Sequence, residues 1–170
     1  AEILSITNTD VHETVRSVAD NADAIFTWDY NKGARKPLEK LYEKAKTSQW
    51  NGATDLDWST DVDIEKVARE MSGAVAFFQQ RMQEVDGSPV KSWGDAEWLQ
   101  FQMEAFNWRM SQFLHGEQGA LICTAKIVET VPWIDAKYYA STQVMDEARH
   151  VEVFAKYLQD KQNGFYPINT

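Results

Sequence analysis

Two long segments of helical periodicity, at residues 95–130 and 132–160, constrain the fold of this chain most strongly. In each segment apolar side chains recur every three or four positions, which places them along one face of an α-helix. The break between the segments falls at Val131-Pro132, and a proline is tolerated in the first turn of a helix. A short turn there makes the two helices antiparallel neighbours. The pattern predicts an all-α fold, an antiparallel helical bundle.

Charged residues interrupt both apolar faces. Glu117 falls in the face that runs from Leu99 to Val128, and Glu147 falls in the face that runs from Ala136 to Leu158. A carboxylate in such a position is costly unless a partner neutralises it. Glu117 lies 15 residues before Pro132 and Glu147 lies 15 residues after it. At ~1.5 Å per residue both carboxylates are ~22 Å from the turn, so we expect them at the same level of the bundle.

His150 lies one helical turn beyond Glu147 on the same face and completes a cluster of two carboxylates and one imidazole. Such a cluster is half of the carboxylate-bridged di-metal site that helical bundles build. Oxygen-rich ligation with one imidazole suits iron or manganese better than zinc. Asp146 and Arg149 flank the ligands, and we expect them to form the supporting hydrogen bonds of the site, with an adjacent helix rather than with their own.

The stretch "DEARH" at residues 146–150, thirty residues after Glu117, resembles the first ligand half of the ferritin-like di-iron carboxylate oxygenases. That superfamily includes bacterial multicomponent monooxygenases and the radical subunits of ribonucleotide reductases. Residues 41–63, "LYEKAKTSQWNGATDLDWSTDVD", also resemble the region before the bundle in its oxygenase members. The resemblance implies a ferritin-like bundle, with Glu117 as a terminal ligand, Glu147 as a bridging ligand and His150 as a ligand of the first iron.

The resemblance also implies an enzyme, an oxidoreductase that activates dioxygen and oxygenates a small organic substrate, with an aromatic one favoured. Two irons would occupy a complete site, with manganese as a possible replacement. An electron-donating reductase or ferredoxin would be the protein partner. The catalytic residues beyond the metal ligands stay unidentified.

The sequence departs from the superfamily in one respect, because it contains a single Glu-x-x-His on these helices. Members supply a second inward Glu and a second Glu-x-x-His from two further helices. The missing half of the ligands is therefore expected from a continuation of the chain or from a second copy around a two-fold axis.

The rest of the chain is expected to complete one ferritin-like helical domain over residues 1–170. Residues 1–60 are predicted to form N-terminal helices and a loop, with a helix from Thr9 or Asp10 to about Trp28 and a shorter one that has Pro37 in its first turn. Hairpin signals are almost lacking. Residues 61–160 are predicted to hold the bundle helices, the first of them over 62–82 with Thr60 or Asp61 as its cap. Residues 161–170 have the composition of a linker.

Composition excludes several classes of function. The chain has 26 acidic against 17 basic residues and a net charge of −9, which disfavours nucleic acid and anionic membranes as partners. No apolar run approaches the ~20 residues that cross a bilayer. The single cysteine, Cys123, fits a reducing compartment, so a cytoplasmic location is expected. Two alternatives to an oxygenase remain: an iron-handling protein, either a ferroxidase or a store, and a non-catalytic helical-bundle subunit whose carboxylates are paired by Arg149 and its neighbours.

Overall fold

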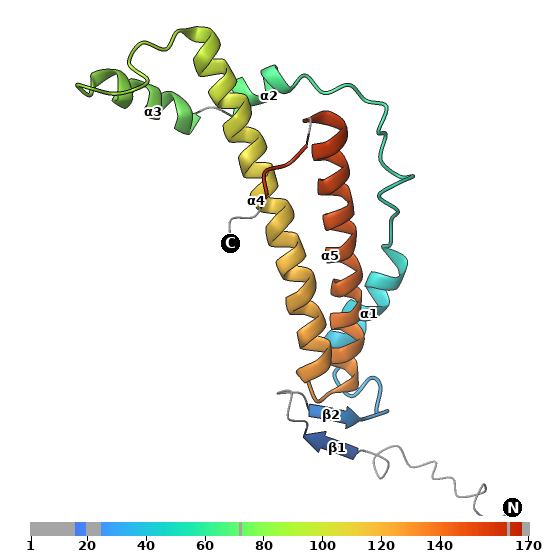
Figure 1. Cartoon of the computed structure of the whole chain (residues 1–170). Helices are drawn as coiled ribbons and strands as arrows, with labels where there is room; N and C mark the ends of the chain where they lie inside the picture. The colour runs from blue at the N-terminus through green and yellow to red at the C-terminus, as the bar shows by residue number, and fades with distance from the viewer. Residues whose placement is uncertain (1–15, 20–24, 72, 163, 168–170) are drawn as a thin grey trace, which may run out of the picture. The chain divides into compact units, whose positions relative to one another are not determined.

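The computed structural model describes residues 16–19, 25–71, 73–162 and 164–167, and these form five helices and one pair of strands (Figure 1). The elements are β1 (Arg16–Ala19), β2 (Ile25–Trp28), α1 (Lys36–Thr47), α2 (Ile64–Glu70), α3 (Gly73–Glu84), α4 (Asp95–Thr130) and α5 (Ile134–Lys161). The prediction of a mostly helical protein is confirmed. None of the described helices has the length and apolar character needed to cross a membrane.

The prediction of a helix that ends near Trp28 is wrong for residues 16–19 and 25–28, which form strands. β1 and β2 pair antiparallel, with Arg16 opposite Trp28 and Ala19 opposite Ile25. The sequence of β2, Ile-Phe-Thr-Trp, consists of β-branched and aromatic residues, which favour the extended backbone of a strand. The remaining parts of that prediction, residues 9–15 and 20–24, lie outside the described residues.

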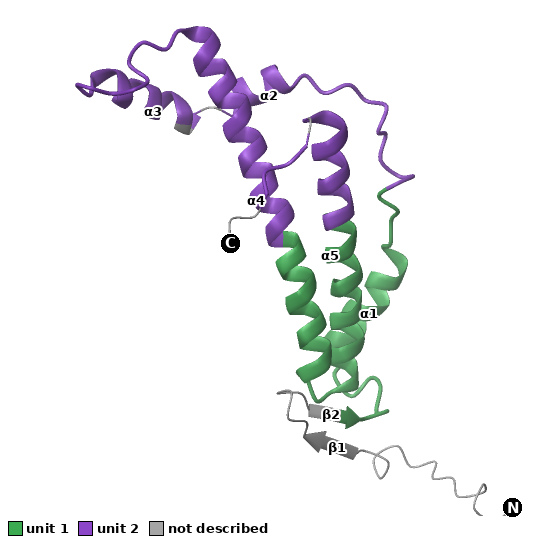
Figure 2. Cartoon of the chain, viewed as in Figure 1, with its two compact units in different colours: residues 1–52, 117–150 green, residues 53–116, 151–170 purple. Residues whose placement is uncertain are grey.

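The chain divides into two compact units, residues 1–52 with 117–150 and residues 53–116 with 151–170 (Figure 2). Both α4 and α5 continue from one unit into the other. The first unit is called the strand-side unit here, because it contains β1 and β2. The second is called the tail-side unit, because it contains residues 164–167.

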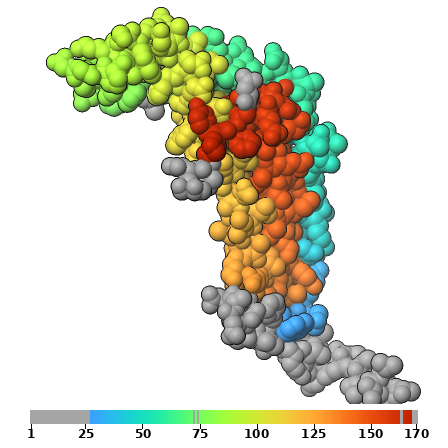
Figure 3. Space-filling view, viewed as in Figure 1, coloured from blue at the N-terminus to red at the C-terminus, as the bar shows by residue number. Residues whose placement is uncertain are grey.

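In the strand-side unit, residues 117–130 of α4 and 134–150 of α5 run antiparallel and lie side by side (Figure 3). The turn between them is short, as predicted, but α5 begins at Ile134, so Pro132 precedes the helix instead of occupying its first turn. Lys137 donates through Nζ to the carbonyl oxygen of Val128 at 2.8 Å. A lysine there satisfies one of the carbonyls that a helix leaves free at its C-terminus, so it ties the end of α4 to the start of α5.

A buried carboxylate fixes the segment before α1 to the start of α5. Asp135 is almost fully buried, and its two oxygens accept hydrogen bonds from the backbone N–H groups of Gly33, at 2.7 Å, and Arg35, at 2.8 Å. Gly33 has a φ of 82°, which favours glycine. Pro37 lies in the first turn of α1, as predicted. These contacts position α1, and the residues that follow it, against α5.

The tail-side unit has an aromatic core around Trp98. The ring of Trp98 contacts the rings of Trp93 and Phe101 edge-on, with centroids 5.0 and 5.9 Å apart. Two predictions for this unit are corrected. The cap of α2 is Asp63, which accepts from the N–H of Lys66 at 2.9 Å, and not Thr60 or Asp61. The predicted helix over 62–82 is divided into α2 and α3, and α3 begins at Gly73, a residue with low helix propensity.

Residues 164–167 lie along α4 (Figure 1). The N–H of Gly164 donates to the carbonyl of Leu158 at 2.9 Å, and Gly164 has a φ of 113°. This bond joins residues six positions apart and satisfies a carbonyl in the last turn of α5. The N–H of Tyr166 then donates to Oγ of Ser111 at 2.9 Å. Residues 164–167, part of the predicted linker, are therefore hydrogen-bonded to α4.

Candidate metal centre

Glu117, Glu147 and His150 converge in the strand-side unit. Nδ1 of His150 lies 3.2 Å from Oε2 of Glu117 and 3.1 Å from Oε2 of Glu147. One ligand atom from each of the three residues lies within 4.8 Å of the others. These distances confirm the prediction that Glu117 and Glu147 lie at the same level of the two helices. Two positions equidistant from a short turn meet when the helices are antiparallel.

The cluster is partly exposed. The exposed fraction is 18% for the side chain of Glu147, 25% for Glu117 and 43% for His150. His150 is the most exposed of the three side chains.

The electrostatics of the cluster favour a cation. Two carboxylates share a single imidazole nitrogen, and at most one proton on Nδ1 can be donated to them. Among the described residues no Lys or Arg forms an ion pair with Glu117 or Glu147. When the imidazole is neutral, the two ionised carboxylates leave a charge of −2, which one divalent cation would balance.

The distances also match those of metal ligands. Two adjacent ligand atoms of an octahedral ion, with bonds of about 2.1 Å, lie about 3 Å apart. The separations of 3.1 and 3.2 Å from His150 have this value. The donor set of two carboxylate oxygens and one imidazole nitrogen suits iron or manganese, whereas structural zinc sites are rich in sulfur and nitrogen. The residues present therefore fit a hard divalent ion.

Asp146 and Arg149 were predicted to contact an adjacent helix rather than their own. This prediction is wrong, because the two side chains pair with each other on α5. Nη1 of Arg149 lies 3.2 Å from Oδ1 of Asp146, one turn back on α5, and the Arg149 side chain is only 5% exposed. Two side chains at positions i and i+3 face each other on one helix, so this pairing is locally favoured. The guanidinium also donates to Gln49 and lies 4.9 Å from the ring centroid of Trp50.

The Arg149 cluster therefore attaches the segment after α1 to α5, next to Glu147 and His150 in sequence. Gln49 and Trp50 were not among the predicted site residues. The signal that could have identified them is the aromatic residue in "SQWNG", an apolar ring in an otherwise polar stretch. The other ring nitrogen of His150, Nε2, forms no hydrogen bond among the described residues.

Other polar residues of α4 have ordinary structural roles. Nε2 of His115 lies 2.9 Å from the carbonyl oxygen of Tyr166, so this histidine holds residues 164–167. The hydroxyl of Thr124 donates to the carbonyls of Ala120 and Leu121 in its own helix. Cys123 is a free, exposed thiol.

A separate apolar cavity of about 520 Å³ lies within the tail-side unit. Its walls come from the loop before α2, from α4 and from the last turns of α5. The aromatic and aliphatic lining residues are Leu56, Trp58, Val62, Met110, Val153, Phe154 and Tyr157. Asp57, at its edge, accepts hydrogen bonds from Ser59 and Thr60, and these bonds lower the pKa of its carboxyl. The cavity has the size and the character of a small-molecule pocket.

Comparison of the chain with protein-family models, with curated proteins and with solved structures gives no match. The resemblance to the di-iron carboxylate oxygenases remains a hypothesis that depends on Glu117, Glu147 and His150.

Proposed function

We propose that Glu117, Glu147 and His150 bind iron as one half of a di-iron carboxylate site, and that the protein is an oxidoreductase that uses dioxygen. The observation that supports this most directly is the position of Nδ1 of His150, within 3.2 Å of carboxylate oxygens from two different helices. The two separations from His150 suit adjacent ligands of one octahedral ion, and the ligand types suit iron or manganese. The fold proposed for the complete protein is a ferritin-like bundle.

Iron in such a site would supply the activation of dioxygen when it is bound. The residues of this chain would hold it. Glu117 and Glu147 offer carboxylate oxygens from α4 and α5, and both must be ionised to bind. His150 must be neutral and must present Nδ1, since that atom faces the two carboxylates. Its proton would then be on Nε2, which is free among the described residues to donate to a carboxylate or a carbonyl.

The cluster contributes three ligand residues, whereas a complete di-iron site of this type takes two Glu residues and two Glu-x-x-His pairs. We propose that the second set comes from further chain or from a second copy. The exposed side of His150 is where such a set would approach. A two-fold copy would repeat the same three residues on the opposite wall.

The proposed substrate is a small organic molecule, with an aromatic one favoured. The 520 Å³ cavity of the tail-side unit supports this choice, because Trp58, Phe154 and Tyr157 offer flat apolar surfaces to a ring. The net charge of −9 would suit a basic patch on a reductase or ferredoxin that donates the electrons.

A non-catalytic bundle is the second candidate, and one observation favours it. A protonated His150 could pair with both carboxylates without any metal. The partner first expected for this role, Arg149, is engaged by Asp146, Gln49 and Trp50 instead. Metal binding separates the two candidates.

The first test is the binding of Mn²⁺ to metal-free protein. Binding is measured as the loss of the electron paramagnetic resonance signal of the free ion. Wild type should bind, and Glu147→Gln should bind at least about tenfold more weakly, since even indirect supports of a metal typically contribute that much. Glu152→Gln is the matched control, because Glu152 is an exposed glutamate on the same helix. Equal binding by all three proteins, or none, would remove the metal centre and favour the non-catalytic bundle.

The second test separates oxygenation from iron handling. Protein loaded anaerobically with Fe²⁺ is mixed with oxygenated buffer, with a reductant and with phenol as a neutral aromatic probe. Oxygen uptake that rises with phenol and yields a hydroxylated product supports an oxygenase. Uptake that follows Fe²⁺ alone, with no organic product from phenol or other small aromatics, indicates a ferroxidase or an iron store.

A further inference from the structure

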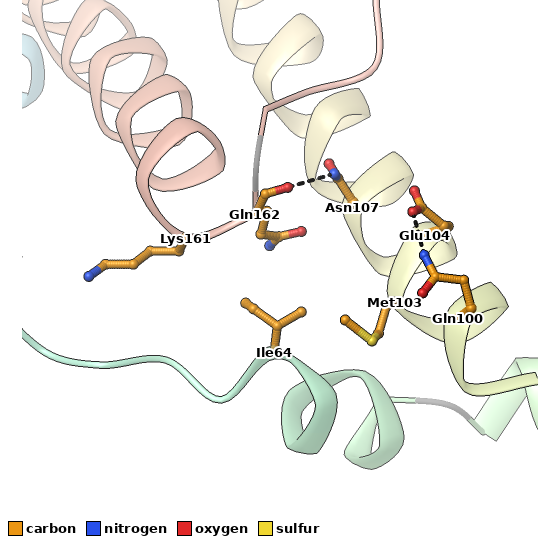
Figure 4. A pocket seen from close by; sticks show the side chains of 7 residues that line it. All are labelled: Ile64, Gln100, Met103, Glu104, Asn107, Lys161 and Gln162. Atoms are coloured by element: carbon orange, nitrogen blue, oxygen red, sulfur yellow. Dashed lines mark hydrogen bonds between the residues drawn. The ribbon is translucent and has the colours of Figure 1, made fainter. Parts of the chain in front are cut away.

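A second, smaller cavity of about 220 Å³ lies within the tail-side unit, between α2, α4 and the end of α5 (Figure 4). Its lining combines two apolar side chains with several polar ones. The residues that matter are Ile64, Met103, Gln100, Glu104, Asn107 and Gln162. It shares only Lys161 with the aromatic cavity, and Figure 4 shows the Lys161 side chain directed away from the other lining residues.

Gln162 has the one side chain in this lining that is both buried and unsatisfied. It is 8% exposed, and neither its amide oxygen nor its amide nitrogen has a hydrogen-bond partner among the described residues. Figure 4 shows its side chain between Asn107 and Ile64. A buried amide without partners is costly, and such groups in native proteins are usually completed by water or by a ligand.

The neighbouring polar groups are already engaged and do not compete for this amide. Nε2 of Gln100 donates to Oε1 of Glu104 at 2.8 Å, and the hydroxyl of Tyr166 donates to Oε2 at 2.5 Å. The second bond raises the pKa of Tyr166. Nδ2 of Asn107 donates to the backbone carbonyls of Gln162 and Gly164, at 3.3 and 3.2 Å. These bonds hold the polar wall in place and leave the Gln162 amide as the free group.

A carboxamide presents one acceptor and one donor side by side in a plane. The group that satisfies both at once carries an N–H and a C=O on one edge, as a lactam or a primary amide does. Ile64 and Met103 supply apolar contacts for the faces of a flat molecule. An anionic carboxylate ligand is disfavoured, because it would lack the donor and would lie near the charge of Glu104.

We propose that this cavity binds a small neutral lactam or primary carboxamide, that Gln162 pairs with its amide edge, and that Ile64 and Met103 hold its faces. The cavity of about 220 Å³ has room for a single small ring. The site lies in the tail-side unit and involves neither Glu117, Glu147 nor His150. It does not depend on the proposed metal centre.

The test uses the full chain without metal and 2-pyridone as the probe, a flat six-membered lactam. Binding is followed by titration calorimetry and by the side-chain amide signals of Gln162 in ¹H–¹⁵N spectra. Wild type should show saturable binding that shifts those signals. N-methyl-2-pyridone, which lacks the N–H, should bind at least about tenfold more weakly, because it leaves the Gln162 oxygen unpaired.

Two variants complete the experiment. Gln162→Met keeps the size of the side chain and removes both polar atoms, so it should lose binding by at least about tenfold. Gln159→Met is the matched control at an exposed glutamine in the last turn of α5, three residues before Gln162, and should bind as wild type does. Saturable binding that is equal for the two pyridones overturns the proposal. Unchanged binding by Gln162→Met also overturns it. The absence of any saturable shift in wild type overturns it as well, because water alone would then fill the cavity. The comparison of the two pyridones stands even if Gln162→Met fails to fold.

Discussion

Nδ1 of His150 on α5 lies 3.2 Å from Oε2 of Glu117 on α4, although 33 positions separate the two residues in the chain. The contact joins two helices at the level expected from their equal distances to Pro132. It gives the proposed metal centre a geometry that mutation can test.

Metal binding should stabilise the folded protein. At a concentration of Mn²⁺ about 100 times its Kd, the free energy of unfolding should rise by ~2.7 kcal/mol, provided that the unfolded chain does not bind the ion. Urea unfolding with and without the ion measures this difference. His150→Ala should lose most of the rise. His115→Ala should keep it, since His115 contacts Tyr166 and not the carboxylates. A rise that survives in His150→Ala would place the ion elsewhere.

Removal of Arg149 should destabilise the strand-side unit. Arg149→Met loses the pair with Asp146, the hydrogen bond to Gln49 and the contact with Trp50. We expect the free energy of unfolding of the metal-free protein to fall by about 2 kcal/mol. This loss is smaller than that for a fully buried ion pair, because Asp146 is partly exposed. Arg81→Met is the control, because its pair with Glu84 is at the surface, and it should change stability by less than about 0.5 kcal/mol. Equal effects of the two variants would contradict the role given to Arg149.

The ratio of metal to protein should reveal the incomplete site. The chain is loaded with Fe²⁺ in the absence of oxygen. Its mass is then measured by analytical ultracentrifugation and its iron content by metal analysis. If a second copy supplies the missing ligands, loading should double the mass and give two ions per two chains. A spin label on Cys123, which is exposed and is the single cysteine, would then report one distance between copies in the loaded protein. A monomer that holds two ions per chain would show that all the ligands are in this sequence.

The aromatic cavity should bind a flat apolar ligand without metal. Calorimetry with 2-naphthol tests this, and Val153→Trp should weaken binding at least about tenfold, since an indole at that position fills space that the ligand needs. Gln159→Trp introduces the same side chain at an exposed position of α5 and should bind as wild type does. Unaltered binding by Val153→Trp would place the ligand elsewhere.

The sequence by itself determined the parts of the protein that depend on local periodicity. The bounds of α4 match the predicted segment 95–130, because a stripe of apolar side chains at helical spacing is a property of consecutive residues. The meeting of Glu117, Glu147 and His150 also followed from counting, since a short turn and a constant rise per residue place equidistant positions at one level.

The tertiary structure decided what depends on partners distant in the chain. β1 and β2 form because each strand satisfies the backbone of the other, and no count along one segment predicts that pairing. Arg149 contacts Gln49, 100 positions away in the chain, and Asp135 holds the segment before α1 against the start of α5. The exposure of His150 and the unsatisfied amide of Gln162 likewise depend on which helices pack beside them, and that is set by the burial of side chains from the whole chain rather than by any local pattern.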